Sequence, residues 1–255
     1  MVTTKYPYNT NLAKGTGFVN ETLTLVEFYE HGESKSDFVA RCISTNILNK
    51  STEKRTKDVL NLVFFDRYWR NDTNVILWLK SMRQEGLSLE AMKTLFLIYT
   101  AKANRVFFDF VKEIKALNQN EKINIGIARQ FILNSISSNL APLWSDSMIK
   151  RVSSYLITCL KDFDLLDSEG YMMPSFPDQR VINYILHELH FDGQRDDEII
   201  RDHTWELLGL SEYQVIKEIE KISFRGTFIF QYSGEILKIG WNYQSMEEFI
   251  ENECR

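Results

Sequence analysis

Apolar side chains recur every three to four residues through most of this chain, which is the spacing of one face of an α-helix. Near the N-terminus the pattern predicts a helix over residues 18–31, a second that Ser36 caps, and a third from Ser51 to about Trp69. This order of helix, turn and helix predicts a helix-turn-helix-like domain over residues 1–74. The side chains expected to face inward are Phe38, Val39, Cys42, Ile43, Val59, Leu60, Val63 and Phe64.

The middle of the chain continues the helical pattern, and residues 75–117 predict two or three further helices rich in aromatic side chains. A two-helix unit follows, with helices over residues 128–138 and 145–163. Residues 165–173 then predict a small hairpin around an Asp-Ser-Glu-Gly turn. Helix, connection, helix and hairpin is the order of a winged helix, so we expect a central helical domain with such a unit over residues 75–175.

The last part of the chain repeats that order. Residues 212–223 predict a helix, and two β-rich runs, 227–232 and 236–241, flank a Gly turn. We expect a third domain over residues 176–255. The predicted fold class is a mainly α, multi-helix globular protein with helix-turn-helix or winged-helix-like elements. It should carry two small β-wings, the clearer one being the β-hairpin near the C-terminus.

Composition excludes several classes of protein. With 44% hydrophobic and 25% charged residues the chain is expected to fold. The longest apolar runs are five residues, far short of the roughly 20 that cross a membrane. The N-terminus has no apolar core typical of a secretory signal. Cys42, Cys159 and Cys254 form no CxxC pair, so we expect unpaired thiols in a reducing cytoplasm.

Charge is distributed unevenly along the chain. Residues 1–160 carry 21 Lys and Arg against 15 Asp and Glu, whereas residues 161–255 carry 9 against 20. Binding to a polyanion depends on a local basic surface, because each neutralised phosphate releases counterions locally. The first 160 residues therefore favour nucleic acid as a partner, and the acidic last third does not.

The helix expected over residues 145–163 has two opposite faces. One arc of about 100° is apolar and consists of Ile149, Val152, Leu156, Cys159, Leu160 and Phe163. Another arc of similar width is polar, lacks acidic residues, and consists of Ser147, Lys150, Arg151, Ser154, Thr158 and Lys161. Cations flanked by hydroxyls suit phosphate contacts, and Arg can also bind a base edge. A solvated face that lacks acids by chance is the alternative interpretation.

A second basic cluster lies at the start of the helix that Ser51 begins. It comprises Lys54, Arg55 and Lys57, with Lys50 just before. In a helix-turn-helix the first residues of the second helix reach the groove of DNA. The turn is longer than in the strict motif, so a solvated first turn is the alternative.

Residues 187–192 and His203 raise the question of a metal site. His187 and His190 are three apart, and Glu188 directly follows the first, so the pattern departs from HExxH. We expect a surface or interdomain segment, with no metal and no cofactor. No phosphate loop, GxSxG or Cys-His signature is present, so we expect neither an enzyme nor a small-molecule substrate.

The order of short motifs along the chain resembles BrxA, a component of the bacteriophage-exclusion (BREX) phage-defence system. The motifs are Gly17-Phe18, Glu21-Thr22, Asn46-Ile47-Leu48, Thr52-Glu53-Lys54-Arg55, Trp144-Ser145-Asp146-Ser147, Arg151-Val152, His187-Glu188-Leu189-His190-Phe191, Trp205-Glu206-Leu207-Leu208-Gly209-Leu210, Gly240-Trp241 and Ser245-Met246-Glu247-Glu248.

This resemblance implies a helical protein with helix-turn-helix elements, a partial likeness to NusB-type helical folds, and binding of double-stranded DNA within a defence complex. It implies no cofactor and transfers no catalytic motif. The regions carried over are Lys54-Arg55 and residues 145–151. Other BREX proteins are further candidate partners. A protein-interaction scaffold and a NusB-like RNA-binding protein are the alternative functions.

Overall fold

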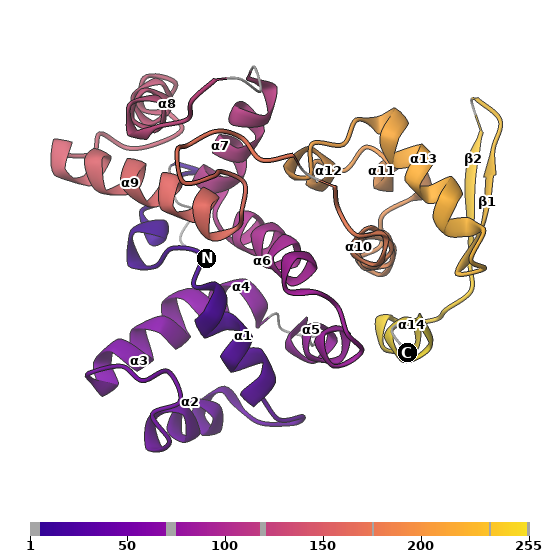
Figure 1. The fold of residues 1–255 in the computed structure, drawn as a ribbon, viewed down its shortest axis with the longest axis horizontal. Helices are drawn as coiled ribbons and strands as arrows, with labels where there is room; N and C mark the ends of the chain where they lie inside the picture. Colours follow the sequence, from indigo (N-terminus) through magenta and orange to yellow (C-terminus); the bar gives the residue numbers. More distant parts are fainter. Residues whose placement is uncertain (1–5, 70–74, 118–120, 175, 235, 254–255) are drawn as a thin grey trace. The chain divides into compact units, whose positions relative to one another are not determined.

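A computed structural model of the chain confirms the mainly helical fold class, with a two-stranded antiparallel sheet near the C-terminus (Figure 1). The structure describes residues 6–69, 75–117, 121–174, 176–234 and 236–253. The chain forms two compact units, the first from residues 1–77 and 96–174, the second from residues 78–95 and 175–255. The division into three domains at residues 74 and 175 stays a prediction.

The N-terminal part of the first unit contains the three helices that the sequence predicts. Its elements are η1 (Asn11–Lys14), α1 (Val19–Phe28), α2 (Lys35–Ser44), α3 (Glu53–Val59), the π-helical turn η2 (Leu60–Phe64) and α4 (Phe65–Tyr68). Helices α3 and α4 continue each other through η2, so the expected helix to about Trp69 is present with one wider turn. Its expected inward positions are buried, as are Phe38 and Cys42 on α2. The other two positions expected to face inward on α2, Val39 and Ile43, are only partly buried.

The expected cap of α2 is wrong by two residues. Ser34, not Ser36, is the N-cap, and its hydroxyl accepts the N–H of Asp37. A capping hydroxyl lies three residues before the N–H that it accepts, and Ser36 already lies inside the helix. Its hydroxyl instead contacts that of Ser34 at 2.8 Å.

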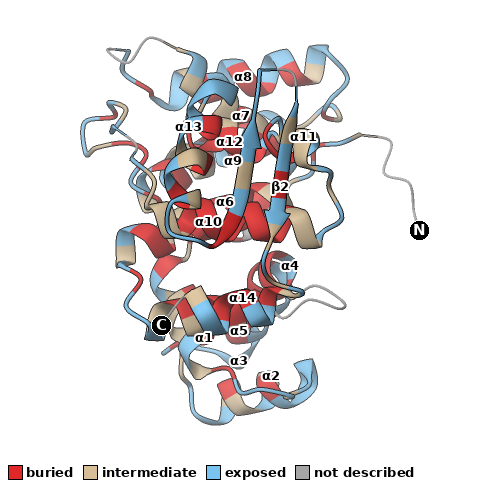
Figure 2. Cartoon of the chain, turned by 90° about the vertical axis from the view of Figure 1, so that its right-hand side faces the viewer, coloured by how far each residue is buried: buried red, intermediate tan, exposed pale blue. Residues whose placement is uncertain are grey.

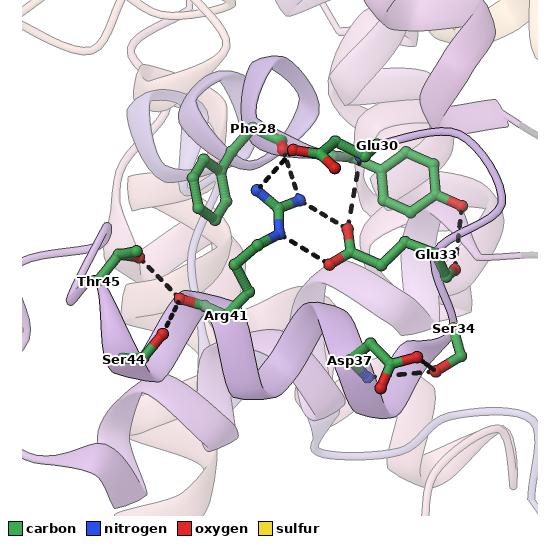
Figure 3. Close-up of polar contacts among 9 residues, drawn as sticks. Phe28, Glu30, Glu33, Ser34, Asp37, Arg41, Ser44 and Thr45 are labelled. Carbon is green, nitrogen blue, oxygen red and sulfur yellow. Dashed lines mark hydrogen bonds and ion pairs between the residues drawn. The ribbon is translucent and has the colours of Figure 1, made fainter.

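One arginine ties α2 to the end of α1 (Figure 3). The Arg41 guanidinium donates to both carboxylate oxygens of Glu33, at 2.8 and 2.6 Å, and to the carbonyl of Phe28 at 2.8 Å. The guanidinium also lies 3.9 Å from the centroid of the Phe28 ring. Hydrogen bonds from Arg41 hold the pKa of Glu33 below its usual value. This pair therefore fixes the turn between α1 and α2.

Five helices follow, as the sequence pattern predicts for residues 75–163. They are α5 (Val75–Gln84), α6 (Leu89–Ala103), α7 (Arg105–Ala116), α8 (Ile125–Ser137) and α9 (Asp146–Asp162). Helices α8 and α9 pack together in the first unit. The first expected wing is smaller than predicted, because residues 165–173 form one antiparallel bridge between Leu166 and Met172.

A glycine segment joins α9 to the helices before it. The N–H of Gly17 donates to Oδ2 of Asp162 at 2.8 Å, and its carbonyl accepts from the buried Arg67 guanidinium at 3.0 Å. A Cβ at Gly17 would lie 2.5 Å from Cβ of Asp162. The position therefore requires glycine, and it sets how α4 and α9 are held within this unit.

The second unit contains the expected helix and hairpin at the end of the chain. Its elements after residue 175 are α10 (Gln179–Phe191), α11 (Asp196–Ile199), α12 (Thr204–Leu207), α13 (Glu212–Ser223), β1 (Phe228–Tyr232), β2 (Leu237–Trp241) and α14 (Met246–Glu253). Figure 2 shows α10 largely buried and much of the hairpin exposed. No helix among the described residues is long and apolar enough to span a bilayer.

The expectation that the histidine-rich stretch lies at the surface or between domains is wrong for His187, although His203 is exposed. His187 is buried on α10, inside the core of the second unit. Its ring stacks on Phe249, with centroids 3.9 Å apart, and the ring of His190 stacks on Trp241 at 4.1 Å. The apolar residues around the histidines bury α10. The prediction rested on the histidine spacing and not on these apolar neighbours.

Candidate nucleic-acid interface

Helix α9 is positioned by its cap and by its apolar face. The Ser145 hydroxyl accepts the N–H of Met148, as expected for a cap at this position. All six residues of the predicted apolar arc are buried: Ile149, Val152, Leu156, Cys159, Leu160 and Phe163. Burial of this face fixes the rotation of α9, so the opposite face must point to solvent.

The polar face of α9 is exposed along its length, at Ser147, Lys150, Arg151, Ser154, Thr158 and Lys161. Within the part of the chain that the structure describes, neither Lys150 nor Arg151 makes an ion pair or a side-chain hydrogen bond. Their charges are therefore available to an anionic ligand. Lys161 differs, because its Nζ donates to the carbonyl of Ser168 at 2.9 Å.

The acidic side chains in the first and last turns of α9 each have a partner within the first unit. Asp146, in the first turn, forms an ion pair with Arg129 of α8 at 2.9 Å. Asp162, in the last turn, accepts the N–H of Gly17. The ion pair with Arg129 offsets the charge of Asp146 beside the first turn of the polar face, whereas the hydrogen bond from Gly17 holds Asp162 in place without neutralising it.

The turn at residues 167–170 lies beside the C-terminal end of α9. The carboxylate of Asp167 accepts the N–H groups of Gly170 and Tyr171, at 2.7 and 2.8 Å, and these bonds lower the pKa of Asp167. The Nζ of Lys122 lies 5.8 Å from the centroid of the Tyr171 ring. Together with Lys161, this lysine adds positive charge beside the turn.

The second basic cluster is less free than the first. Lys50 is mostly covered and forms a 2.8 Å ion pair with Glu21, and Lys57 lies 3.9 Å from Glu53 on the same helix. Exposed Arg55 lies 5.9 Å from the centroid of the Phe18 ring. Lys54 is exposed and forms no ion pair or side-chain hydrogen bond with another described residue. Lys54 and Arg55 are therefore the cations of α3 best placed for an anion.

The structure keeps the two clusters apart. Figure 1 shows the first turn of α9 and the first turn of α3 at separate places on the first unit. This unit as a whole holds 19 Lys and Arg against 17 Asp and Glu, and the second unit holds 11 against 18. A preference for polyanions would therefore come from the two local surfaces and not from the charge of the whole unit.

Two basic residues near α9 were not found from the sequence. Arg129 lies on α8 and reaches the first turn of α9, and Lys122 lies near the turn after α9 because the N–H of Ile123 donates to the carbonyl of Gly170. Both depend on pairing between distant segments. A Cβ at Gly170 would lie 2.6 Å from the carbonyl oxygen of Ile123, so only glycine allows the two segments to approach this closely. Gly170 is therefore the one residue in the sequence that could have indicated this contact.

The lysines of α13 provide a contrast in the second unit. Lys217 forms an ion pair with Glu220 at 2.8 Å, and Lys221 forms one with Glu218 at 2.5 Å. Both lysines are exposed, but each has an acidic partner within one helical turn. The α13 face is consequently close to neutral, unlike the polar face of α9.

Residues with possible metal or redox chemistry lie outside these surfaces. Among the described residues, no three His, Cys, Asp or Glu side chains are grouped as metal ligands. Cys42 and Cys159 are buried free thiols, and burial raises the pKa of each to about 12. Cys254 lies outside the described residues.

This chain is similar to a solved structure and to a protein family. A crystal structure of an uncharacterized protein from Magnetospirillum magneticum has a TM-score of 0.59 to it at 14% identity, covering 82% of this chain and 99% of the other. At this identity the likeness shows a shared fold. No curated protein matches the chain. The family model described as BrxA matches residues 6–188.

Proposed function

The chain belongs to the BrxA family, and from this premise we propose that it is a non-catalytic accessory protein that binds double-stranded DNA. Membership of this family suggests a role associated with a bacteriophage-exclusion system. The proposed site lies on the first unit, and the proposed ligand is the phosphate backbone of a duplex. The proposed location is the cytoplasm, where such a duplex is accessible.

The observation that carries the proposal is the exposed, acid-free face of α9. Lys150 and Arg151 lie side by side on it without an acidic partner among the described residues. Hydroxyls at Ser147 and Ser154 flank them, and both are exposed. Lys, Arg and Ser side chains are among the groups that contact phosphate oxygens, and such contacts position a protein on DNA without reading its sequence.

The cations at the start of α3 provide a second contact on the same unit. Lys54 and Arg55 are exposed, whereas Lys50 is neutralised by Glu21 and contributes less. We propose that each of the two separate surfaces contacts its own stretch of phosphate backbone. Because both are phosphate contacts, we propose binding that tolerates many DNA sequences. The interpretation of α8, α9 and the turn after them as a winged-helix-like unit belongs to the same proposal.

A protein-interaction scaffold is the second candidate, and the charge of the second unit favours it. That unit holds 11 Lys and Arg against 18 Asp and Glu. In this alternative its acidic surface docks a basic partner within the defence complex. RNA binding is less favoured, because single-stranded RNA is recognised by exposed aromatic side chains beside cations. On the polar face of α9 the exposed side chains are hydroxyls and cations.

The test is fluorescence anisotropy with labelled duplex DNA, duplex RNA and single strands of equal length at two salt concentrations. If Lys54, Lys150 and Arg151 each contact one phosphate, affinity for duplex DNA should fall about 40-fold between 50 and 200 mM salt. The protein should bind duplex DNA more tightly than duplex RNA or single-stranded RNA. Absence of binding to duplex DNA at low salt and micromolar protein would contradict the proposal, and so would a clear preference for RNA.

A further inference from the structure

The second unit has a hollow between the start of α10 and the exposed face of α13. The two helices pack against each other (Figure 1), and the hollow beside them has a volume of about 380 Å³. The buried Ile182 of α10 and the half-buried Leu210 before α13 form its apolar floor. Ligand pockets typically measure roughly 300–1,000 Å³, so this hollow suits a short segment of a chain and not a folded domain.

Two exposed aromatic rings form the sides of the hollow. Phe176, just before α10, is 90% exposed, and Tyr213, in the first turn of α13, is 69% exposed. Pro177 also lines the hollow, next to Phe176. Aromatic rings supply a large contact area with few rotatable bonds, so they lose little entropy when a ligand covers them. The sides of the hollow therefore favour an apolar ligand.

The charged side chains that line the hollow already have partners. Lys217 forms an ion pair with Glu220, and Lys221 forms one with Glu218. Glu218 also accepts from the side-chain amide of Gln179 at 3.5 Å. A charged ligand would have to compete with these pairs, and the excess of acidic residues in the second unit repels phosphate groups. The charges of the rim therefore match an uncharged ligand.

Two hydrogen-bond donors at the hollow have no such partner. The side-chain oxygen of Gln214 accepts from the N–H and the hydroxyl of Ser211, both at 2.9 Å, so the Nε2 of Gln214 is left over. Within the part of the chain that the structure describes, neither this Nε2 nor the hydroxyl of Tyr213 takes part in a hydrogen bond. A ligand with free carbonyl groups can accept from both.

We propose that this hollow binds an uncharged, proline-rich segment of a partner protein in the polyproline II conformation. Such a segment has backbone carbonyls that make no internal hydrogen bonds, so they accept from Gln214 and Tyr213. Its proline rings pack on Phe176 and Tyr213, as in other aromatic-lined grooves that recognise this conformation. Because the segment is already extended and stiff before it binds, a small hollow can hold it with little loss of conformational entropy.

The other common forms of a bound peptide fit the hollow less well. An added strand pairs with the edge of a sheet, whereas α13 and the segment before α10 line this hollow. An amphipathic helix places several turns of apolar side chains in a long groove, and this hollow is short. The inference does not rest on DNA binding, because the hollow shares no residue with the proposed DNA-binding surfaces of the first unit.

Fluorescence anisotropy of a labelled decaproline peptide, titrated with the full chain up to about 1 mM, tests this inference. The wild-type protein should bind the peptide saturably, with the same affinity at about 50 and 500 mM salt because no free charges meet. Two uncharged peptides of the same length serve as controls, one of alternating glycine and serine and one of alternating leucine and serine. Both should bind at least about tenfold more weakly than decaproline.

Variants of the aromatic sides locate the binding. Tyr213→Ala should weaken decaproline binding about tenfold or more, and Tyr213→Phe, which removes only the hydroxyl, should weaken it about two- to fivefold. The matched control Phe224→Ala removes a ring that is 84% exposed just after α13 but does not line the hollow, and should bind as wild type does. Because these side chains are exposed, the variants should stay folded, which circular dichroism can verify.

Phe176→Ala, outside any helix, takes the place of Tyr213→Ala if that variant does not fold, and should weaken binding to a similar extent. A wild-type chain that does not bind decaproline saturably overturns the inference. Equal or tighter binding of the leucine–serine peptide overturns it as well, because the hollow would then accept any apolar chain. So does wild-type affinity in the folded alanine variant.

Discussion

The ring of His187 should stay neutral well below the pH at which histidine is normally protonated. Its Nδ1 lies 2.9 Å from the carbonyl of Asn183. A carbonyl only accepts hydrogen bonds, so Nδ1 carries the proton and Nε2 is the bare nitrogen. Nε2 is buried and has no hydrogen-bond partner among the described residues. Burial, with a smaller contribution from the nearby His190, lowers the pKa of His187 to about 4, and the hydrogen bond to Asn183 only partly opposes this shift.

The sign of the effect on stability follows from this lowered pKa. Below about pH 6.5 the unfolded chain binds a proton at His187 that the folded chain does not. The stabilisation is therefore complete above pH 6.5 and is lost as the pH falls from 6.5 to 4. A difference of 2.5 pKa units corresponds to about 3 kcal/mol in total, and about 2 kcal/mol should already be lost at pH 5.

Urea unfolding at pH 7 and pH 5 measures this loss when wild type is compared with His187→Phe. The phenylalanine ring keeps the stack on Phe249 but cannot titrate, so the wild-type protein should lose about 2 kcal/mol more than the variant. An NMR titration of the imidazole gives the pKa directly. Equal losses in the two proteins, or a titration midpoint near pH 6.5, would refute the reasoning.

Two further predictions concern the first unit. Gly17→Ala should lower the free energy of unfolding by about 1–3 kcal/mol, because its Cβ would lie 2.5 Å from Cβ of Asp162; an unchanged melting temperature would contradict the close approach. Cys42 and Cys159 should resist a thiol reagent at pH 8 in the folded protein and react after unfolding, because burial raises both pKa values. This is measured in a Cys254→Ser background, and rapid reaction of either thiol would contradict its burial.

Local signals explain what the sequence predicted well. The helix over residues 212–223 has the predicted bounds because Ser211 and Gln214 form a capping box that marks its start. The hairpin after it was predicted from two β-rich runs around a Gly turn. The buried arc of α9 was predicted from spacing alone, because six apolar residues at helical intervals leave one possible inner face.

Contacts between distant segments explain what the sequence did not predict. Lys50 is neutralised by Glu21, 29 positions earlier, so its proximity to Lys54 in the sequence overstated the basic cluster. Gly17 and Asp162 are 145 positions apart, and nothing in either segment marks the other as its partner. For α10, the histidine spacing suggested a metal site, whereas the apolar residues of the same segment predict a buried helix. Partners and burial of this kind follow from packing, which one sequence does not reveal.

Charge reversal on two helices tests the proposed DNA-binding surface most directly. Lys150→Glu with Arg151→Glu replaces two phosphate attractions with two repulsions on the acid-free face of α9. Lys217→Glu with Lys221→Glu makes the same change in charge on α13, where both lysines already pair with Glu220 and Glu218. Because all four side chains are exposed, both variants should stay folded, as circular dichroism can verify.

The decisive measurement is the affinity of each folded variant for duplex DNA at 50 mM salt. Each phosphate contact contributes about 0.9 to the slope of log affinity against log salt concentration, so the loss of two contacts lowers this slope by about 1.8. The account predicts that the α9 variant loses detectable binding, while the α13 variant binds within a few-fold of wild type. Retained binding by the α9 variant together with lost binding by the α13 variant would contradict the account and place the DNA on the second unit.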